Sequence, residues 1–289
     1  MKQICIISGK GGTGKTVFAA SFAALAQKKV MADCDVDAAD LYLLLHPRTQ
    51  EKHEFYGGKV AIIDAAKCTR CGRCVEECRY SAIDNFQVIA AACEGCGVCH
   101  LVCKENAVEM EDRLCGQWFV SDTDYGPMVH AKLGVAAENS GKLVTQVRQK
   151  AKQIAEEWQL DLVVIDGPPG IGCPVLASLT GVDLALIITE PTLSGVHDME
   201  RIHEVCKKFG IRDAVCVNKF DINPEITGRI ESWCRSQSAP LAGRVQFDRK
   251  VVESVSAGIP FVEHSNGETA QQIRIIYQNS LKLASGERK

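Results

Sequence analysis

Apolar residues along the 289-residue chain alternate between short uninterrupted runs and longer amphipathic stretches. The runs predict parallel strands buried on both faces, and the stretches, with apolar residues at helical spacing, predict helices. The predicted strands are Lys2–Ile7, Val30–Cys34, Leu160–Ile165, Leu184–Thr189 and Ala214–Val217, and the predicted helices are Thr16–Lys28, Lys142–Trp158, Gly195–Phe209, Pro224–Gln237 and Glu268–Leu283. This alternation predicts an α/β fold with a doubly wound, mostly parallel sheet.

One stretch interrupts this pattern. Eight of the 15 cysteines fall between Cys68 and Cys103, and the other seven are scattered. Such a concentration indicates a module inserted into the α/β domain. We place the insert at residues 57–112, with Gly57-Gly58 as the linker into it, which leaves 1–56 and 113–289 as one discontinuous domain.

The first predicted strand leads into a phosphate-binding loop. Residues 9–16 match G-x-x-x-x-G-K-[ST] between a strand and a helix, which is the context that this motif requires. Glycines let backbone N–H groups surround a phosphate at the positive end of a helix. The predicted nucleotide-binding residues are Gly9, Lys10, Gly11, Gly12, Thr13, Gly14, Lys15 and Thr16, of which Lys15 reaches the β- and γ-phosphates and Thr16 binds Mg²⁺.

Carboxylates at other strand ends complete the predicted magnesium site. Asp166 closes one buried strand and is the best candidate Mg²⁺ ligand, although it could instead cap a helix. Asp33 and Asp35 follow the second strand at the same carboxyl edge, where ligands bind in such sheets. Asp33 is a possible further metal residue, and either aspartate could instead only cap a loop.

These segments together resemble the MinD/ParA/Mrp and nitrogenase iron-protein superfamily. The additional Lys10 resembles its deviant Walker A motif, the stretches at Asp33–Asp35 and Asp166–Gly170 its switch regions, and Asn218–Asp221 its adenine-recognition stretch. The resemblance implies a nucleotide-sandwich dimer, formed with a second copy or a paralogue, in which Lys10 reaches the partner's phosphates. It also implies that Asp35 positions the attacking water and that Asn218 binds adenine.

The cysteine spacing within the insert predicts two [4Fe–4S] clusters. C-x₂-C-x₂-C-x₃-C occurs twice, and in this bacterial ferredoxin run three cysteines hold one cluster and the fourth reaches the other. One cluster would use Cys68, Cys71, Cys74 and Cys103, and the other Cys93, Cys96, Cys99 and Cys78. Zinc is the alternative metal. Arg79 and Lys104 stand where ferredoxins have proline, and we expect these cations to raise the cluster potentials.

The whole chain resembles MinD-superfamily ATPases with an inserted ferredoxin-like domain. Cys173 lies where the nitrogenase iron protein has a cluster ligand, but Ala136-Ala137-Glu138 replaces the other ligand. Cys173 is therefore either a metal ligand at a dimer interface or a small residue in a switch loop. We expect the remaining six cysteines to be inert, and those on apolar runs to be buried.

Charge and hydropathy exclude several functions. A net charge of −3 gives no basic surface for nucleic acid, and no apolar run is long enough to span a membrane. Without an export signal, the expected location is the cytoplasm.

Three functions remain open at the level of the sequence. In the first, an ATPase couples nucleotide-dependent dimer rearrangement to electron transfer through the two clusters, toward a redox partner. In the second, an ATPase assembles or matures the cofactor of a client metalloprotein. In the third, a MinD-like positioning ATPase carries structural or redox-sensing clusters.

Overall fold

The computed structural model describes residues 1–134 and 139–286. The chain divides into two compact units, which we describe separately. The sheet unit comprises Met1–Lys52, Trp118–Lys132 and Ser140–Lys289, and the cysteine unit comprises His53–Gln117 with Leu133–Asn139. The longer segment of the cysteine unit, His53–Gln117, begins and ends a few residues outside the predicted insert at residues 57–112.

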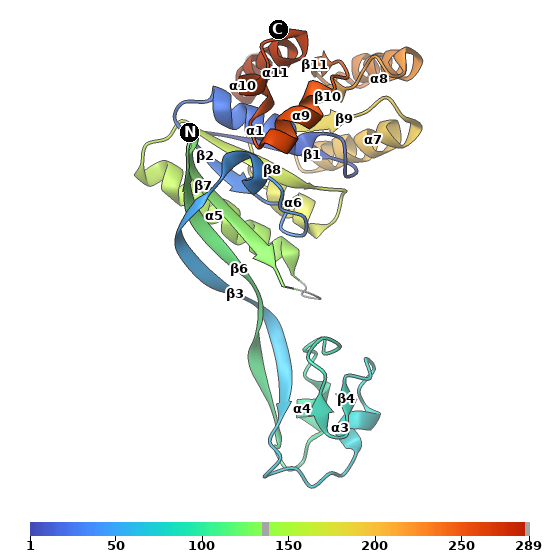
Figure 1. The fold of residues 1–289 in the computed structure, drawn as a ribbon. Helices are drawn as coiled ribbons and strands as arrows, with labels where there is room; N and C mark the ends of the chain where they lie inside the picture. Colours follow the sequence, from blue (N-terminus) through green and yellow to red (C-terminus); the bar gives the residue numbers. More distant parts are fainter. Residues whose placement is uncertain (135–138, 287–289) are drawn as a thin grey trace. The chain divides into compact units, whose positions relative to one another are not determined.

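A sheet of nine strands, in the order β11-β10-β9-β1-β8-β2-β7-β6-β3, forms the centre of the fold (Figure 1). All pairings from β11 through to β7 are parallel, which confirms the predicted mostly parallel α/β architecture. The strands are β1 (Lys2–Ser8), β2 (Lys29–Asp33), β3 (Arg48–Ile63), β6 (Val108–Thr123), β7 (Gly126–Leu133), β8 (Leu162–Pro169), β9 (Leu184–Thr189), β10 (Asp213–Asn218) and β11 (Leu241–Val245).

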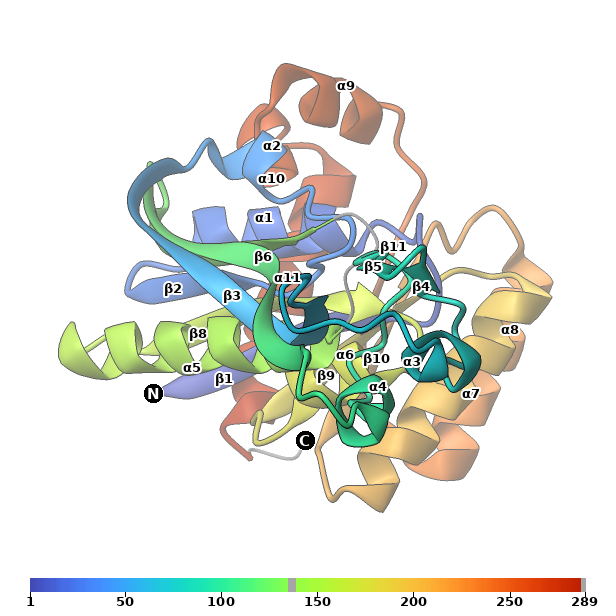
Figure 2. The same ribbon diagram turned by 90° about the horizontal axis from the view of Figure 1, so that it is seen from below.

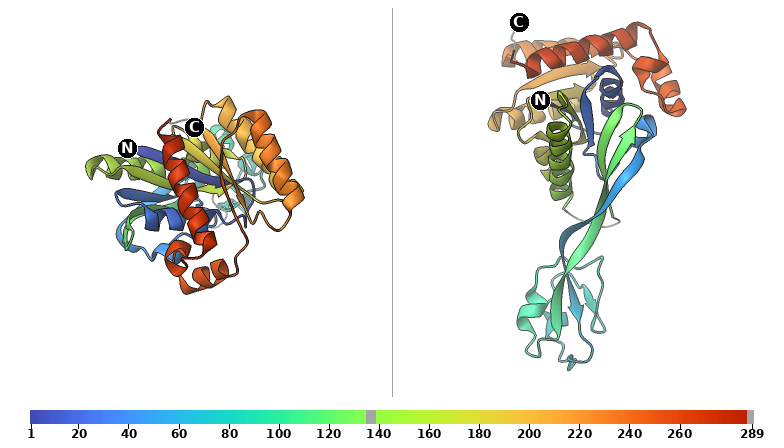
Figure 3. Two further views of the ribbon diagram at one scale, coloured as in Figure 1. Left: turned by 90° about the horizontal axis from the view of Figure 1, so that it is seen from above. Right: turned by 90° about the vertical axis from the view of Figure 1, so that its left-hand side faces the viewer.

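Helices cover both faces of the parallel strands. On one face α1 packs against β1 and β8, and α11 packs against β9 to β11 and crosses the sheet in the view from above (Figure 3). On the other face α5 packs along β2 and β8, and α6, α7 and α8 cover β1, β8, β9 and β10 (Figure 2). The helices are α1 (Lys15–Leu25), α2 (Tyr42–Leu45), α5 (Ser140–Glu157), α6 (Cys173–Leu179), α7 (Leu193–Lys208), α8 (Pro224–Gln237), α9 (Lys250–Ala257), α10 (Phe261–His264) and α11 (Glu268–Ala284).

Alternation along the strands explains why two layers of helices are needed. Ile4 and Ile6 of β1 belong to a buried cluster with Phe22 of α1 and Ile273 of α11. The residue between them, Cys5, points to the other face, where its thiol lies 3.7 Å from the hydroxyl of Ser178 in α6. Both faces of β1 are therefore buried, as its uninterrupted apolar run predicts.

The structure corrects the predicted linker into the insert. Gly57 and Gly58 are not a linker, because both lie within β3, a strand of 16 residues. A side chain at position 57 would meet Phe55 and the thiol of Cys115. The same strand and the equally long β6 carry the chain from the sheet unit into the cysteine unit and back.

Apart from these two long strands, the cysteine unit contains only short elements. They are α3 (Arg73–Glu76), β4 (Ile83–Asp84), β5 (Gln87–Val88) and α4 (Val98–Val102), of which β4 and β5 form an antiparallel pair. Over the described residues of both units, no helix is both long enough and apolar enough to cross a membrane.

Candidate nucleotide and cysteine sites

The loop between β1 and α1 has a backbone shape that only its glycines allow. Gly12 and Gly14 have φ values of 80° and 89°, in the left-handed region that other residues rarely adopt. At Gly9, an added Cβ would lie 2.1 Å from Cβ of Asp198 in α7. The loop therefore lies at the carboxyl edge of the sheet, tightly packed between α1 and α7.

Lys15, at the start of α1, connects the loop to two strand ends. Its Nζ lies 2.9 Å from Oδ1 of Asp166 and 3.2 Å from Oδ2 of Asp35, and all three side chains are buried. Burial alone would lower the pKa of Lys15, but the two carboxylates raise it above its usual value. The lysine is thus held charged, and three of the predicted catalytic residues lie together.

Asp33 is a third carboxylate near this lysine. It is the register partner of Asp166 on the neighbouring strand, and its Oδ1 accepts a hydrogen bond of 3.1 Å from the backbone of Asp35. Its Oδ2 is buried and has no hydrogen-bond partner among the described atoms. Burial, and then the charge of Asp166, raise the pKa of Asp33 well above its usual range. A buried carboxylate that lacks a partner for one oxygen is suited to a cation or its bound water.

Lys10 points away from Lys15. Its Nζ lies 3.2 Å from both the Thr192 hydroxyl and the Ser194 hydroxyl, and 3.7 Å from the carboxylate of Glu190. These residues stand at the end of β9 and the start of α7. In this structure Lys10 is therefore bound by hydroxyl and carboxylate groups of its own chain.

Asn218, at the end of β10, contacts the phosphate loop directly. Its Nδ2 donates a hydrogen bond of 2.8 Å to the Thr13 carbonyl, and its Oδ1 accepts one from the backbone of Lys219. The predicted adenine ligand thus anchors the loop in this structure. Thr16, the predicted Mg²⁺ ligand, is half-buried one residue after Lys15.

Sequence reasoning missed Glu190, and it included Lys219 only as part of the stretch that resembles adenine recognition. The Lys219 ammonium pairs with Glu190 and lies 3.5 Å from the Gly12 carbonyl, so Glu190 binds two lysines beside the loop. Their position in the sequence could have identified them. Both residues directly follow an apolar strand, so they lie at the carboxyl edge of the sheet, where ligands bind.

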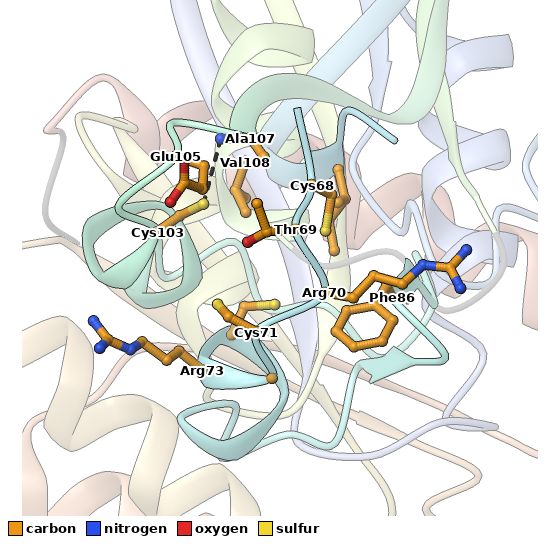
Figure 4. A pocket seen from close by; sticks show the side chains of 13 residues that line it. Cys68, Thr69, Arg70, Cys71, Arg73, Phe86, Cys103, Glu105, Ala107 and Val108 are labelled. Atoms are coloured by element: carbon orange, nitrogen blue, oxygen red, sulfur yellow. Dashed lines mark hydrogen bonds between the residues drawn. The ribbon is translucent and has the colours of Figure 1, made fainter. Parts of the chain in front are cut away.

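Two pockets in the cysteine unit are each lined by four cysteines. The first cysteine pocket is lined by Cys68, Cys71, Cys74 and Cys103 (Figure 4). The second cysteine pocket is lined by Cys78, Cys93, Cys96 and Cys99. These are the two quartets that the sequence predicts. Across the described residues, no three His, Cys, Asp or Glu side chains stand close enough to hold a single metal ion.

The two pockets are built by an internal repeat offset by 25 residues. Helix α3 begins at Arg73 and α4 at Val98, each after a glycine with positive φ. In each half a backbone N–H, of Ala82 or Ala107, lies 3.3 Å from the sulfur of the fourth cysteine. The duplicated spacing in the sequence therefore corresponds to duplicated geometry.

The other cysteines lie apart from these pockets. Cys173 is exposed at the first residue of α6, beside Gly141 at the start of α5, and the counterpart segment 136–138 lies outside the described residues. Cys5, Cys34, Cys206 and Cys216 are buried as expected, and burial raises the pKa of the Cys5 thiol to about 11.

The sequence of this chain is similar to the sequences of known proteins. The chain is similar to the uncharacterized protein MJ0578 of Methanocaldococcus jannaschii, with 36% identity over 224 residues, which are 76% of this chain and 79% of that protein. It is 26% identical over 166 residues to an iron-sulfur cluster carrier protein of Pyrococcus abyssi, covering 52% of this chain and about half, 56%, of that relative.

Its fold matches a solved structure and a family model. The septum site-determining protein MinD from Pyrococcus horikoshii, complexed with Mg-ADP, superposes with a TM-score of 0.61 at 18% identity, covering 100% of this chain and 99% of that one. The model of the CobQ/CobB/MinD/ParA nucleotide binding domain matches residues 4–261. Since that match covers most of the sequence, the chain belongs to the CobQ/CobB/MinD/ParA nucleotide-binding family.

Proposed function

We propose that this MinD/ParA-like ATPase is an iron–sulfur protein, in which nucleotide-dependent rearrangement of a dimer is coupled to electron transfer through two [4Fe–4S] clusters. ATP hydrolysis is the activity of the MinD/ParA family. One observation carries the more specific proposal: the same chain holds a phosphate loop with its lysine–aspartate cluster and two pockets lined by four cysteines each.

At the nucleotide site, residues 9–14 would bind phosphate through backbone N–H groups. Lys15 would exchange its contacts with Asp35 and Asp166 for the β- and γ-phosphates, which frees both carboxylates. Asp166, with Thr16, would then bind Mg²⁺, and Asp35 would orient the attacking water. The unpaired Oδ2 of Asp33 fits the same cation through a bound water. Mg²⁺, when bound, neutralises charge on the phosphates.

At the cysteine pockets, the donor sets fit [4Fe–4S] clusters better than zinc. A zinc site needs four thiolates at about 2.3 Å from one ion. A cubane instead takes one thiolate at each of four irons, so its ligands surround a volume, as the two quartets do. The clusters, when bound, supply one-electron redox chemistry. The N–H groups of Ala82 and Ala107 would stabilise added negative charge on the ligand sulfurs.

Lys10 provides the proposed link between nucleotide and dimer. To reach phosphates in a partner subunit, it must leave Glu190, Thr192 and Ser194 of its own chain. Bound ATP offers Lys10 a stronger anionic partner than Glu190 alone. ATP would therefore favour the dimer, and hydrolysis would return Lys10 to its own chain.

The test is EPR-monitored redox titration of the reconstituted chain without nucleotide, with MgADP and with MgATP. We expect MgATP to change the cluster potentials or the EPR line shape. Lys10→Ala should abolish ATP turnover and this MgATP response while the cluster absorbance stays intact. Spectra and potentials that are indifferent to nucleotide would refute the coupling. Normal turnover in Lys10→Ala would refute the role of Lys10.

A second function, cluster assembly or maturation of a client, is favoured by the relative that is named an iron-sulfur cluster carrier protein. Eight cysteines that complete two quartets favour retained clusters over transferred ones. ATP-dependent loss of iron from the chain to an apo-ferredoxin would support this second function instead.

A further inference from the structure

The two cysteine pockets carry side chains of opposite charge. Arg70 and Arg73 line the first cysteine pocket, together with one carboxylate, Glu105. Glu77 and Glu94 are the charged residues that line the second cysteine pocket. The cysteine unit therefore has one pocket with a net positive lining and one with a negative lining.

The two arginines are free to meet a partner. Their side chains extend in opposite directions away from Cys71 (Figure 4). Both arginines and Cys71 are exposed, and Arg70 is held over the ring of Phe86 at 5.9 Å. Within the described part of the chain, neither arginine belongs to an ion pair. Two cations without an ion pair thus flank Cys71, the one cysteine of the first quartet that is exposed.

The repeat shows that this difference in charge is not required to build a pocket. At the positions 25 residues after Arg70 and Arg73, the second half has Gly95 and Val98. Conversely, the first-half counterpart of Glu94 is the uncharged Thr69. The same backbone is therefore formed with and without these charges.

Three other cations near the pockets do not remove this difference in charge. Arg113, a half-buried residue, donates a hydrogen bond of 3.1 Å to the Cys93 carbonyl but does not line the second pocket. Arg79 and Lys104 occupy equivalent places in the two halves, directly after each fourth cysteine, so their contributions balance.

We propose that the first cysteine pocket is the docking face for an acidic one-electron carrier protein. This inference rests on the proposed function, because it needs a cluster in that pocket. The reduced carrier loses one electron and the oxidised cluster gains it, with no bond made and no proton moved. Since the chain as a whole carries a net charge of −3, an acidic carrier is attracted only locally, by Arg70 and Arg73.

The experiment follows reduction of the full-length, cluster-loaded chain by stopped flow, with flavodoxin hydroquinone as the acidic carrier. We expect Arg70→Glu/Arg73→Glu to lower the second-order rate constant about tenfold at low salt. The difference should vanish at about 1 M salt, where the Debye length is only about 3 Å. Arg70→Gln/Arg73→Gln should give an intermediate rate, and provides the test if the double glutamate variant does not hold its clusters.

Lys207→Glu/Lys208→Glu is the matched control, because it changes the net charge equally at two exposed cations of α7 that line neither pocket and are not adjacent to a cysteine of either quartet. It should leave the rate near that of the unaltered chain. With full iron content, an unchanged rate constant in the Arg70/Arg73 variants would overturn the proposed docking face. An equal fall in the rate constant of the control variant would overturn it as well. A chain that takes up no iron would overturn the proposed function as well.

Discussion

At the scale of single residues, Asn218 gives a test between two roles. Its amide holds the Thr13 carbonyl at 2.8 Å, so Asn218→Ala should loosen the phosphate loop itself. We expect affinity to fall about tenfold, for the loss of about 1.4 kcal/mol of hydrogen bonding. Calorimetry should find this loss for ATP and for inorganic triphosphate alike. A loss confined to ATP would instead show that Asn218 contacts adenine and does not support the loop.

The sequence could predict most of the nucleotide site because its residues follow one rule. Asp33 ends β2, Asp35 follows it by two residues, and Asp166 lies in the carboxyl-terminal half of β8. Parallel strands end at the same edge of a sheet, so the three carboxylates lie near that edge. The position of the Lys10 side chain could not be predicted. It depends on contacts with Thr192 and Ser194, more than 180 residues away in the chain, which no local pattern encodes.

At the scale of elements, the packing of α7 against the phosphate loop can be tested with two glycines. Gly9→Ala places a Cβ against Asp198 and should displace α7, at a cost of about 1–3 kcal/mol in unfolding free energy. Gly11→Ala is the matched control, because no atom lies within 4 Å of its added Cβ. Urea unfolding of both variants provides the measurement. Equal stability of the two would show that α7 does not pack closely on the loop.

The long strand β3, which the sequence did not predict, has a clear physical signature. Every residue of β3 from Arg48 to Lys52 is exposed, and only three residues of the whole strand are buried. Without an apolar run or a regular alternation, the stretch resembles a polar linker. In contrast, β9 is buried throughout, and its predicted bounds, Leu184–Thr189, are those observed.

At the scale of the whole molecule, the two units differ in how they are held together. Among the described residues, the core of the sheet unit includes large side chains such as Phe18, Phe22 and Phe261. The buried cluster described in the cysteine unit consists of Ala61, Ala82, Cys93 and Val108. The partly buried side chains packed against it include Val60, Ile63, Val88 and Met110 besides three cysteines. So small an apolar core supplies little folding free energy, and a unit of this kind usually depends on disulfides or metal.

Removal of iron should therefore unfold one unit and leave the other intact. For a metal site formed only in the folded state, the free energy of metal binding contributes to folding. We expect amides of residues 64–107 to exchange with solvent much faster in the iron-free chain than after reconstitution, as measured by hydrogen-exchange mass spectrometry. Peptides of β1 and β8 are the internal control and should keep their protection, because both strands lie at the centre of the sheet. Equal protection of residues 64–107 with and without iron would mean that the cysteine unit folds on its apolar contacts alone.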